Sequence, residues 1–146
     1  SIINRLSFLE NESKKLIPQI IEEIRITLAK GGINVIEISG RLKTAFSIWQ
    51  KMQRRNVPMD QLSDIMAFRI LVESTQNCYL SLGLIHSKYP NVIGRFKDYI
   101  STKKRNGYQS LHTSVIGPFK QKIEIQIKSR IRKKIKSPSE VKSKLK

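Results

Sequence analysis

Two acidic residues stand out in a chain that is rich in cations. The 146 residues include 28 Lys and Arg but 11 Asp and Glu. Asp64 comes just before an apolar run at 65–72, and Glu124 lies in the alternating segment 122–128. A carboxylate at a strand edge can hold Mg²⁺ beside a nucleotide phosphate, and a carboxylate among cations stays ionised or acts as a base. The plainer alternatives are that Asp64 caps a helix or turn and that Glu124 belongs to a solvated strand face.

A basic stripe follows Gly40 in the sequence. Lys43, Ser47 and Lys51 recur at four-residue steps, so they share one face of the helix expected over about 44–54. Point charges with a hydroxyl donor suit a triphosphate, although an ordinary solvated basic face has the same spacing. Arg41 precedes the stripe in what we interpret as a turn after a strand.

Arg69 has a different context, because it lies inside the apolar run. A buried charge without a partner is very costly, so we expect Arg69 to meet an anion, a carboxylate or an aromatic plane. The alternative is a buried ion pair with a structural acid.

The segment 104–115, KRNGYQSLHTSV, contains many groups that can bind ligands. Asn106 and Gly107 form a turn dipeptide, and Tyr108, Ser110 and His112 then share one face of a predicted strand. An aromatic ring such as that of Tyr108 can stack on a nucleobase. Edge-strand packing of Tyr108 and a satisfied polar role for His112 are the alternatives.

Hydrophobic periodicity places these residues on a set of elements. We expect a helix over 3–30, with a break or early turn at Pro18 and an end at Gly31-Gly32. A strand at 33–39, a helix at 44–54, a strand buried on both faces at 65–72 and a helix at 76–89 follow. The last part is a long basic loop at 90–107 and a hairpin of strands 108–116 and 122–128 around Gly117-Pro118. This order predicts an α+β fold, a mixed sheet with helices packed on it.

Length and charge limit the class of protein. The length suggests one core, and no apolar run is long enough for a membrane span. The single cysteine, Cys78, excludes a disulfide framework and a multi-cysteine metal site, which fits the cytoplasm. The net charge is +17, of which +8 lies in residues 128–146, so the rest of the chain is basic in its own right. We therefore expect a polyanionic partner such as nucleotide phosphates, nucleic acid or an acidic membrane.

Four segments together resemble the synthetase domain of the RelA/SpoT family, the (p)ppGpp synthetases. They are EISGRLKTAFSIWQKMQRRNV, QLSDIMAFRILV, the long segment CYLSLGLIHSKYPNVIGRFKDYISTKKRNGYQSLHTSVIGP, and IEIQI, within about residues 5–127. The resemblance implies a nucleotidyltransferase-like fold of the polymerase-β type. It also implies a reaction in which the β,γ-pyrophosphate of ATP moves to the ribose 3′-hydroxyl of GDP or GTP and AMP is released.

The resemblance also implies a role for each matching residue. Asp64 is expected to bind Mg²⁺, and Glu124 to take the hydroxyl proton and help with the metal. Arg41 and Arg69 are expected to clamp the adenine, and Lys43, Ser47 and Lys51 to contact the ATP phosphates. The residues expected on the GDP or GTP side are Lys104, Asn106, Tyr108, His112 and Gln126.

The resemblance divides the chain into N-terminal connector helices (1–31), a synthetase core (32–128) and a basic, disordered tail (129–146). Family members usually continue after this last strand with a helix that walls the acceptor pocket, and its replacement by the basic tail would weaken the synthetase. RFKD at 95–98 resembles the variant in bifunctional members, which hydrolyse (p)ppGpp with a separate N-terminal domain. We expect this chain to have no such domain and no hydrolase activity. The alternative function is an inactive nucleotide- or RNA-binding remnant. The tail could also hold RNA or an acidic surface, and the oligomeric state is not predicted.

Overall fold

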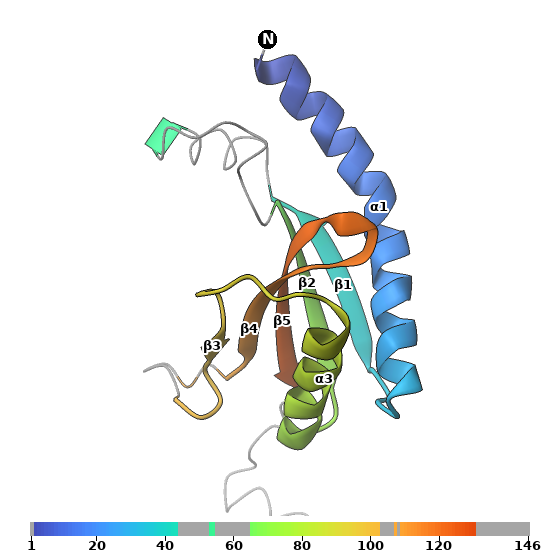
Figure 1. Ribbon diagram of the computed structural model, residues 1–146, viewed down its shortest axis with the longest axis vertical. Helices are drawn as coiled ribbons and strands as arrows, with labels where there is room; N and C mark the ends of the chain where they lie inside the picture. The colour runs from blue at the N-terminus through green and yellow to red at the C-terminus, as the bar shows by residue number, and fades with distance from the viewer. Residues whose placement is uncertain (1, 44–52, 55–64, 103–106, 108, 131–146) are drawn as a thin grey trace, which may run out of the picture.

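The computed structural model describes residues 2–43, 53–54, 65–102, 107 and 109–130 (Figure 1). Its elements in chain order are α1 (Ile2–Lys30), β1 (Glu37–Leu42), β2 (Met66–Val72), α3 (Thr75–Lys88), β3 (Lys97–Asp98), β4 (Leu111–Ile116), the 3₁₀ helix η2 (Pro118–Lys120) and β5 (Lys122–Ser129). The strands form one five-stranded sheet in the order β1-β2-β5-β4-β3. β2 and β5 are parallel, and the other neighbouring pairs are antiparallel. The mixed sheet is the arrangement that the sequence predicts.

α1 is one continuous helix, so the predicted break at Pro18 is wrong. Proline removes one intrahelical hydrogen bond, but Pro18 is exposed to solvent. Ile17 and Ile20 lie on either side of it and pack into the core. This packing favours a helix across the proline, because tertiary contacts supply most of a helix's stability.

The predicted end of α1 at the glycine pair is confirmed. The amide of Ile33 donates to the carbonyl of Leu28 at 2.9 Å, and the amide of Gly32 donates to that of Ala29 at 3.0 Å. Gly32 has a φ of 85°, the left-handed conformation that this type of helix end requires. The side chain of Ile33 is buried against the core.

β1 begins and ends later than the predicted strand at 33–39. Ile33 belongs to the end of α1, whereas pairing with β2 continues to Leu42 opposite Met66. The expectation that Arg41 lies in a turn is therefore wrong, since Arg41 is a strand residue opposite Ala67. This position fixes the side of the sheet from which Arg41 projects.

The helix predicted over 44–54 lies outside the described residues except for positions 53 and 54. The other described elements follow the predictions closely. β2 and α3 differ from the predicted ranges by one residue at each displaced end, and the Ser74 hydroxyl caps α3 by accepting from the amide of Asn77 at 3.1 Å. β4 and β5 form the predicted hairpin through η2. The stretch predicted as a long loop at 90–107 contains β3, which pairs with β4. β5 ends at Ser129, one residue beyond the predicted core.

The two faces of the sheet have different environments. α1 and α3 both contact the sheet and each other, and they cover one face (Figure 1). That face supplies the core, including Met66, Phe68, Ile70, Leu111, Val115, Ile123, Ile125 and Ile127. Within the described residues, no helix covers the opposite face. Its strand residues are mostly polar and partly or fully exposed. We call this the open face.

Among the helices that the structure describes, none has the length and apolar character needed to cross a membrane.

Candidate active site

A row of five side-chain positions crosses the open face, one from each strand. Strand register aligns them in the order Ser39, Arg69, Gln126, His112 and Lys97. Paired residues on neighbouring strands project to the same side of a sheet. We call these five residues the polar row. It brings together residues that are distant in the sequence: Ser39 and Gln126 are 87 positions apart.

A second alignment lies beside the polar row. Arg41 is opposite Ala67, Ala67 is opposite Glu124, and Glu124 is opposite Ser114. The two alignments bring four predicted site residues, Arg41, Arg69, Glu124 and Gln126, onto three adjacent strands.

A pocket of about 290 Å³ lies at the β1 side of the open face. Its lining consists of Ser39, Gly40, Arg41, Ala67, Phe68, Arg69 and Gln126. Arg41 and Arg69, which the sequence predicts to act as a pair, therefore line the same pocket. Guanidinium planes stack readily on aromatic rings, so a flat heterocycle suits the space that they line.

Arg69 is exposed, although the sequence predicts a buried position for it. β2 reads as an almost continuous apolar run, but only one of its faces meets the helices. Arg69 projects from the other face, so the cost of a buried charge does not arise. Its side chain is available to a ligand in the pocket.

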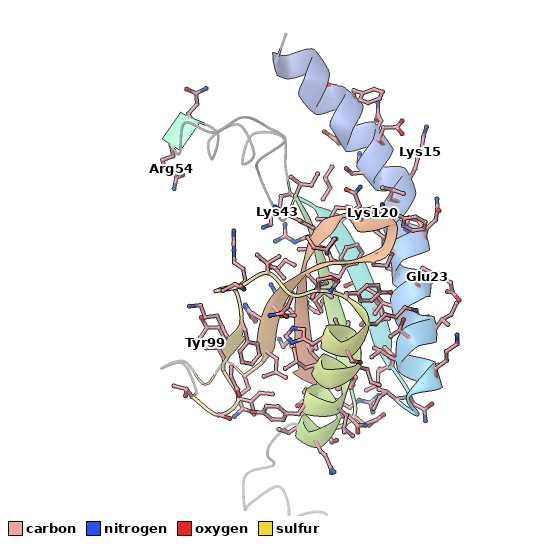
Figure 2. The ribbon with its side chains drawn as sticks, in the orientation of Figure 1. Lys15, Glu23, Lys43, Arg54, Tyr99 and Lys120 are labelled. Carbon is pink, nitrogen blue, oxygen red and sulfur yellow. The ribbon has the colours of Figure 1, made fainter. Side chains whose placement is uncertain are left out.

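Glu124 is the acid of the open face for which the structure gives the most detailed contacts. Its Oε1 accepts a hydrogen bond from Nε2 of Gln126 at 3.0 Å, and its Oε2 lies 3.6 Å from Nζ of Lys43. The side chains of Lys43 and Glu124 are 17% and 25% exposed, so their attraction is only partly screened by water. Figure 2 shows Lys43 at the end of the sheet where β1 ends.

The pKa of Glu124 results from opposing effects. Burial raises the pKa, but the hydrogen bond from Gln126 and the charges of Lys43 and His112 together lower it by more. The net result is a pKa below the ordinary value of 4.5. Glu124 is therefore an ionised carboxylate at neutral pH, ready to attract a cation or a proton.

Towards the β3 edge of the sheet, the contacts on the open face centre on His112. The ring of His112 contacts that of Tyr99 edge to face, with centroids 5.1 Å apart. Figure 2 shows Tyr99 beside β3. Tyr99 is held by its backbone, because its amide donates to the carbonyl of Ser110 at 2.9 Å. The strand residue and the loop residue thus form one aromatic pair.

The loop that carries Tyr99 is tied to α3 through Asp98. Oδ1 of Asp98 accepts from the amides of Ile100 and Ser101 at 2.9 and 2.8 Å, and the hydroxyl of Tyr79 donates to Oδ2 at 2.9 Å. Burial raises the pKa of Asp98, but these hydrogen bonds lower it more strongly. An ionised Asp98 therefore fixes the start of the segment that leads to residues 104–108.

The structure places half of the predicted site residues. It brings together Arg41, Lys43, Arg69, Glu124, Gln126 and His112. The other predicted residues, Ser47, Lys51, Asp64, Lys104, Asn106 and Tyr108, lie outside the described residues. The sequence predicts that Ser110 shares a strand face with His112, but Ser110 lies one residue before β4, which begins at Leu111.

Sequence reasoning missed Ser39 and Tyr99. The position of Ser39 could have been found from its alternation with Gly40 and Arg41 had β1 been extended to Leu42. No signal in the sequence marks the contact of Tyr99 with His112, because it depends on the path of an irregular loop.

A metal site would need ligands beyond those that the described residues bring together. Within them, no group of three or more His, Cys, Asp or Glu residues could hold an ion. The half-buried carboxylate of Glu124 is a hard oxygen donor of the kind that Mg²⁺ prefers. Such an ion commonly takes one or two carboxylates together with substrate phosphates.

Comparison with known proteins identifies the family. A model of the region found in RelA / SpoT proteins matches residues 40–145. The chain belongs to the RelA/SpoT family. The match extends beyond residue 127, where the resemblance noted in the sequence ends, and so includes most of the basic tail.

Two RelA/SpoT relatives show the extent of the similarity. GTP pyrophosphokinase rsh of Brucella ovis is 42% identical over 130 residues, which cover 89% of this chain and 17% of that protein. GTP pyrophosphokinase of Escherichia coli is 40% identical over 114 residues, covering 78% of this chain and 15% of that protein. The chain thus spans about a sixth of the length of these relatives.

Solved structures agree with the fold. Small alarmone synthetase 2 of Bacillus subtilis has a TM-score of 0.57 and 26% identity, and the match covers 85% of this chain and 68% of that one. Small alarmone synthetase 1 of the same organism, bound to its product pppGpp, has a TM-score of 0.56 and 24% identity, with 82% and 72% covered. The α+β, nucleotidyltransferase-like fold expected from the sequence is confirmed.

Proposed function

We propose that this chain is a (p)ppGpp synthetase module that transfers pyrophosphate from ATP to the 3′-hydroxyl of GDP or GTP. The observation that carries the proposal is the open face, where Arg41, Arg69, Glu124 and His112 gather on adjacent strands. Membership of the RelA/SpoT family and relatives named GTP pyrophosphokinase support it.

The pocket lined by Arg41 and Arg69 takes the adenine of ATP. Two guanidinium planes can hold the flat base, and both residues line one space. Lys43 lies near Glu124 and would meet the phosphates, with Ser47 and Lys51 extending the contacts along the chain. Transfer of this kind depends mainly on positioning and on neutralising phosphate charge, which these cations supply.

The acceptor nucleotide binds on the His112 side of Glu124. His112 and the neighbouring segment with Lys104, Asn106 and Tyr108 supply polar contacts and a ring that can stack on guanine. The 3′-oxygen forms a bond to the β-phosphorus of ATP, while the bond from that phosphorus to the oxygen bridging to the α-phosphate breaks. AMP leaves with that electron pair, and the hydroxyl proton passes to Glu124.

Mg²⁺ would be held by Glu124 and by Asp64, which precedes β2 by two residues in the sequence. The parallel pairing of β2 with β5 makes these two strands neighbours, which favours a shared ion. When bound, Mg²⁺ neutralises phosphate charge and orients the reacting groups. Glu124 contributes an ionised oxygen, and Lys43 competes for that oxygen until phosphates draw it away.

The test is direct synthesis. The purified chain is incubated with Mg²⁺, GDP and ATP labelled in its β,γ-phosphates, and the products are separated by thin-layer chromatography. We expect guanosine tetraphosphate from the wild type, and a loss of about 100-fold or more for Glu124→Gln and Asp64→Asn. Glu23→Gln, an exposed change on α1, is the matched control and should leave the rate unchanged.

A wild type that binds ATP but yields no tetraphosphate would instead identify the chain as a nucleotide-binding remnant of the family. Equal rates for the wild type and Asp64→Asn would also remove the proposed role of the two acids.

A further inference from the structure

The two oxygens of Glu124 are held by unlike partners. Oε1 accepts from the Gln126 amide at 3.0 Å, a normal hydrogen-bond length. Oε2 is 3.6 Å from the Lys43 ammonium, which is an ion-pair distance but long for a hydrogen bond. The contact with Gln126 is therefore the tighter of the two, and it leaves Oε2 as the oxygen that can exchange partners.

Gln126 is also the more firmly placed partner. It lies in β5, which pairs with β2 on one side and with β4 on the other. Its neighbours Ile125 and Ile127 are fully buried and anchor the strand to the core. Lys43 instead follows the last residue of β1, at the edge of the sheet. The structure thus pairs one fixed donor with one donor at the end of a strand.

We propose that Gln126 is a positioning residue that holds Oε1 of Glu124, so that Oε2 faces the reacting groups when Lys43 leaves. This inference rests on the proposed function and deepens it. The resemblance gives Gln126 a contact with the acceptor nucleotide, whereas the structure gives it a contact with Glu124. The alternation of β5 puts Glu124 and Gln126 on the same face two residues apart. The amide can therefore reach the carboxylate without any change in the backbone.

The proposal separates two kinetic effects. A residue that orients the base affects the rate of the transfer step, whereas a residue that contacts GDP affects its binding. We expect Gln126→Leu to lower kcat by about 10- to 100-fold, the usual cost of losing a residue that orients a catalytic ligand. The KM value for GDP should stay within about twofold of the wild type.

A matched control is available on the same hairpin. Gln121 lies next to η2, and its side-chain Nε2 donates to the backbone carbonyl of Phe119 at 3.3 Å. Gln121→Leu makes the same chemical change away from Glu124, and we expect wild-type kcat and KM. Thermal unfolding of both variants checks that each remains folded.

A spectroscopic measurement tests the contact without turnover. The side-chain amide protons of Gln126 are followed by NMR in the ligand-free protein. Glu124→Ala removes the acceptor, so the resonance of the bonded proton should move upfield. Glu37→Ala, which removes an exposed carboxylate from β1, should leave that resonance in place.

The outcomes distinguish the two proposals. A wild type that makes no tetraphosphate overturns the proposed function, and the catalytic role of Gln126 falls with it. An active wild type in which Gln126→Leu raises KM for GDP at unchanged kcat overturns only the positioning role. The same holds if Glu124→Ala leaves the Gln126 resonance unmoved.

Discussion

At the scale of single residues, the charge of Glu124 is decided by its neighbours. Burial alone would favour the protonated acid, yet Gln126, Lys43 and His112 together keep its pKa below the ordinary value. A carboxylate held in this way is a weak base while Lys43 is close. Donor binding that moves Lys43 onto phosphate would remove one of the groups that lower the pKa.

Lys43→Met tests this balance. The change removes a positive charge 3.6 Å from Oε2, so the pKa of Glu124 should rise. The pKa is read from the carboxyl ¹³C shift of Glu124 across an acid titration. Lys15→Met, an exposed change on α1, is the control and should leave the titration curve in place (Figure 2). A curve for Lys43→Met that matches the wild type would mean that the ion pair does not persist in solution.

At the scale of elements, α1 and β2 approach β1 closely beside the pocket that Arg41 and Arg69 line. Gly40 lies between Arg41 and Ser39, and on the core side of β1 it faces Phe68 and Ile17. A Cβ at Gly40 would lie 2.6 Å from Cε2 of Phe68 and 2.9 Å from Cγ2 of Ile17. The absence of a side chain therefore allows the helix and the ring to pack closely beneath the pocket.

Gly40→Ala should destabilise the protein by about 1–3 kcal/mol, because a core that is already packed must shift. Gly83→Ala is the contrasting change on α3, where a Cβ would meet no atom within 4 Å. Since alanine favours helix over glycine, we expect Gly83→Ala to stabilise by about 0.5–1 kcal/mol. Urea unfolding of both variants measures the two effects. Equal behaviour of the two alanines would contradict the close packing at Gly40.

At the scale of the whole molecule, helices cover one face of the sheet and the proposed site lies on the other. His86 belongs to the covered side, where its Nε2 lies 2.7 Å from Oγ1 of Thr113 and its ring meets Phe96 edge to face. Burial lowers the pKa of His86 from its ordinary value of 6.5. The unfolded chain therefore binds a proton here more readily than the folded protein does.

This difference predicts the direction of a pH effect on stability. As the pH falls through 6.5, protons bind preferentially to the unfolded chain, so the wild type should lose stability. His86→Gln keeps a side chain that can bond Thr113 but does not titrate, and it should lose less stability between pH 7.5 and 5.5. Thermal unfolding at both values measures the change. The exposed control Ser87→Gln should follow the wild type, and a His86→Gln response equal to it would contradict the assignment.

The sequence alone determined the fold class, the family resemblance and the order of the described elements other than β3. The apolar pattern at 65–72 and the alternation of Ile123, Glu124, Ile125 and Gln126 predicted two strands and the outward face of the second. These features are local, because each depends on the spacing of neighbouring side chains. The resemblance added roles for residues far apart in the chain.

Only the tertiary structure decided which strand neighbours which, and which face remains uncovered. It corrected the turn at Arg41, the break at Pro18 and the burial of Arg69, and it gave Gln126 a partner in Glu124. A periodic pattern predicts that a strand or helix has two different faces, but it does not predict what packs against each face. That depends on contacts between segments distant in sequence, such as α1 and α3 meeting on the same side of the sheet.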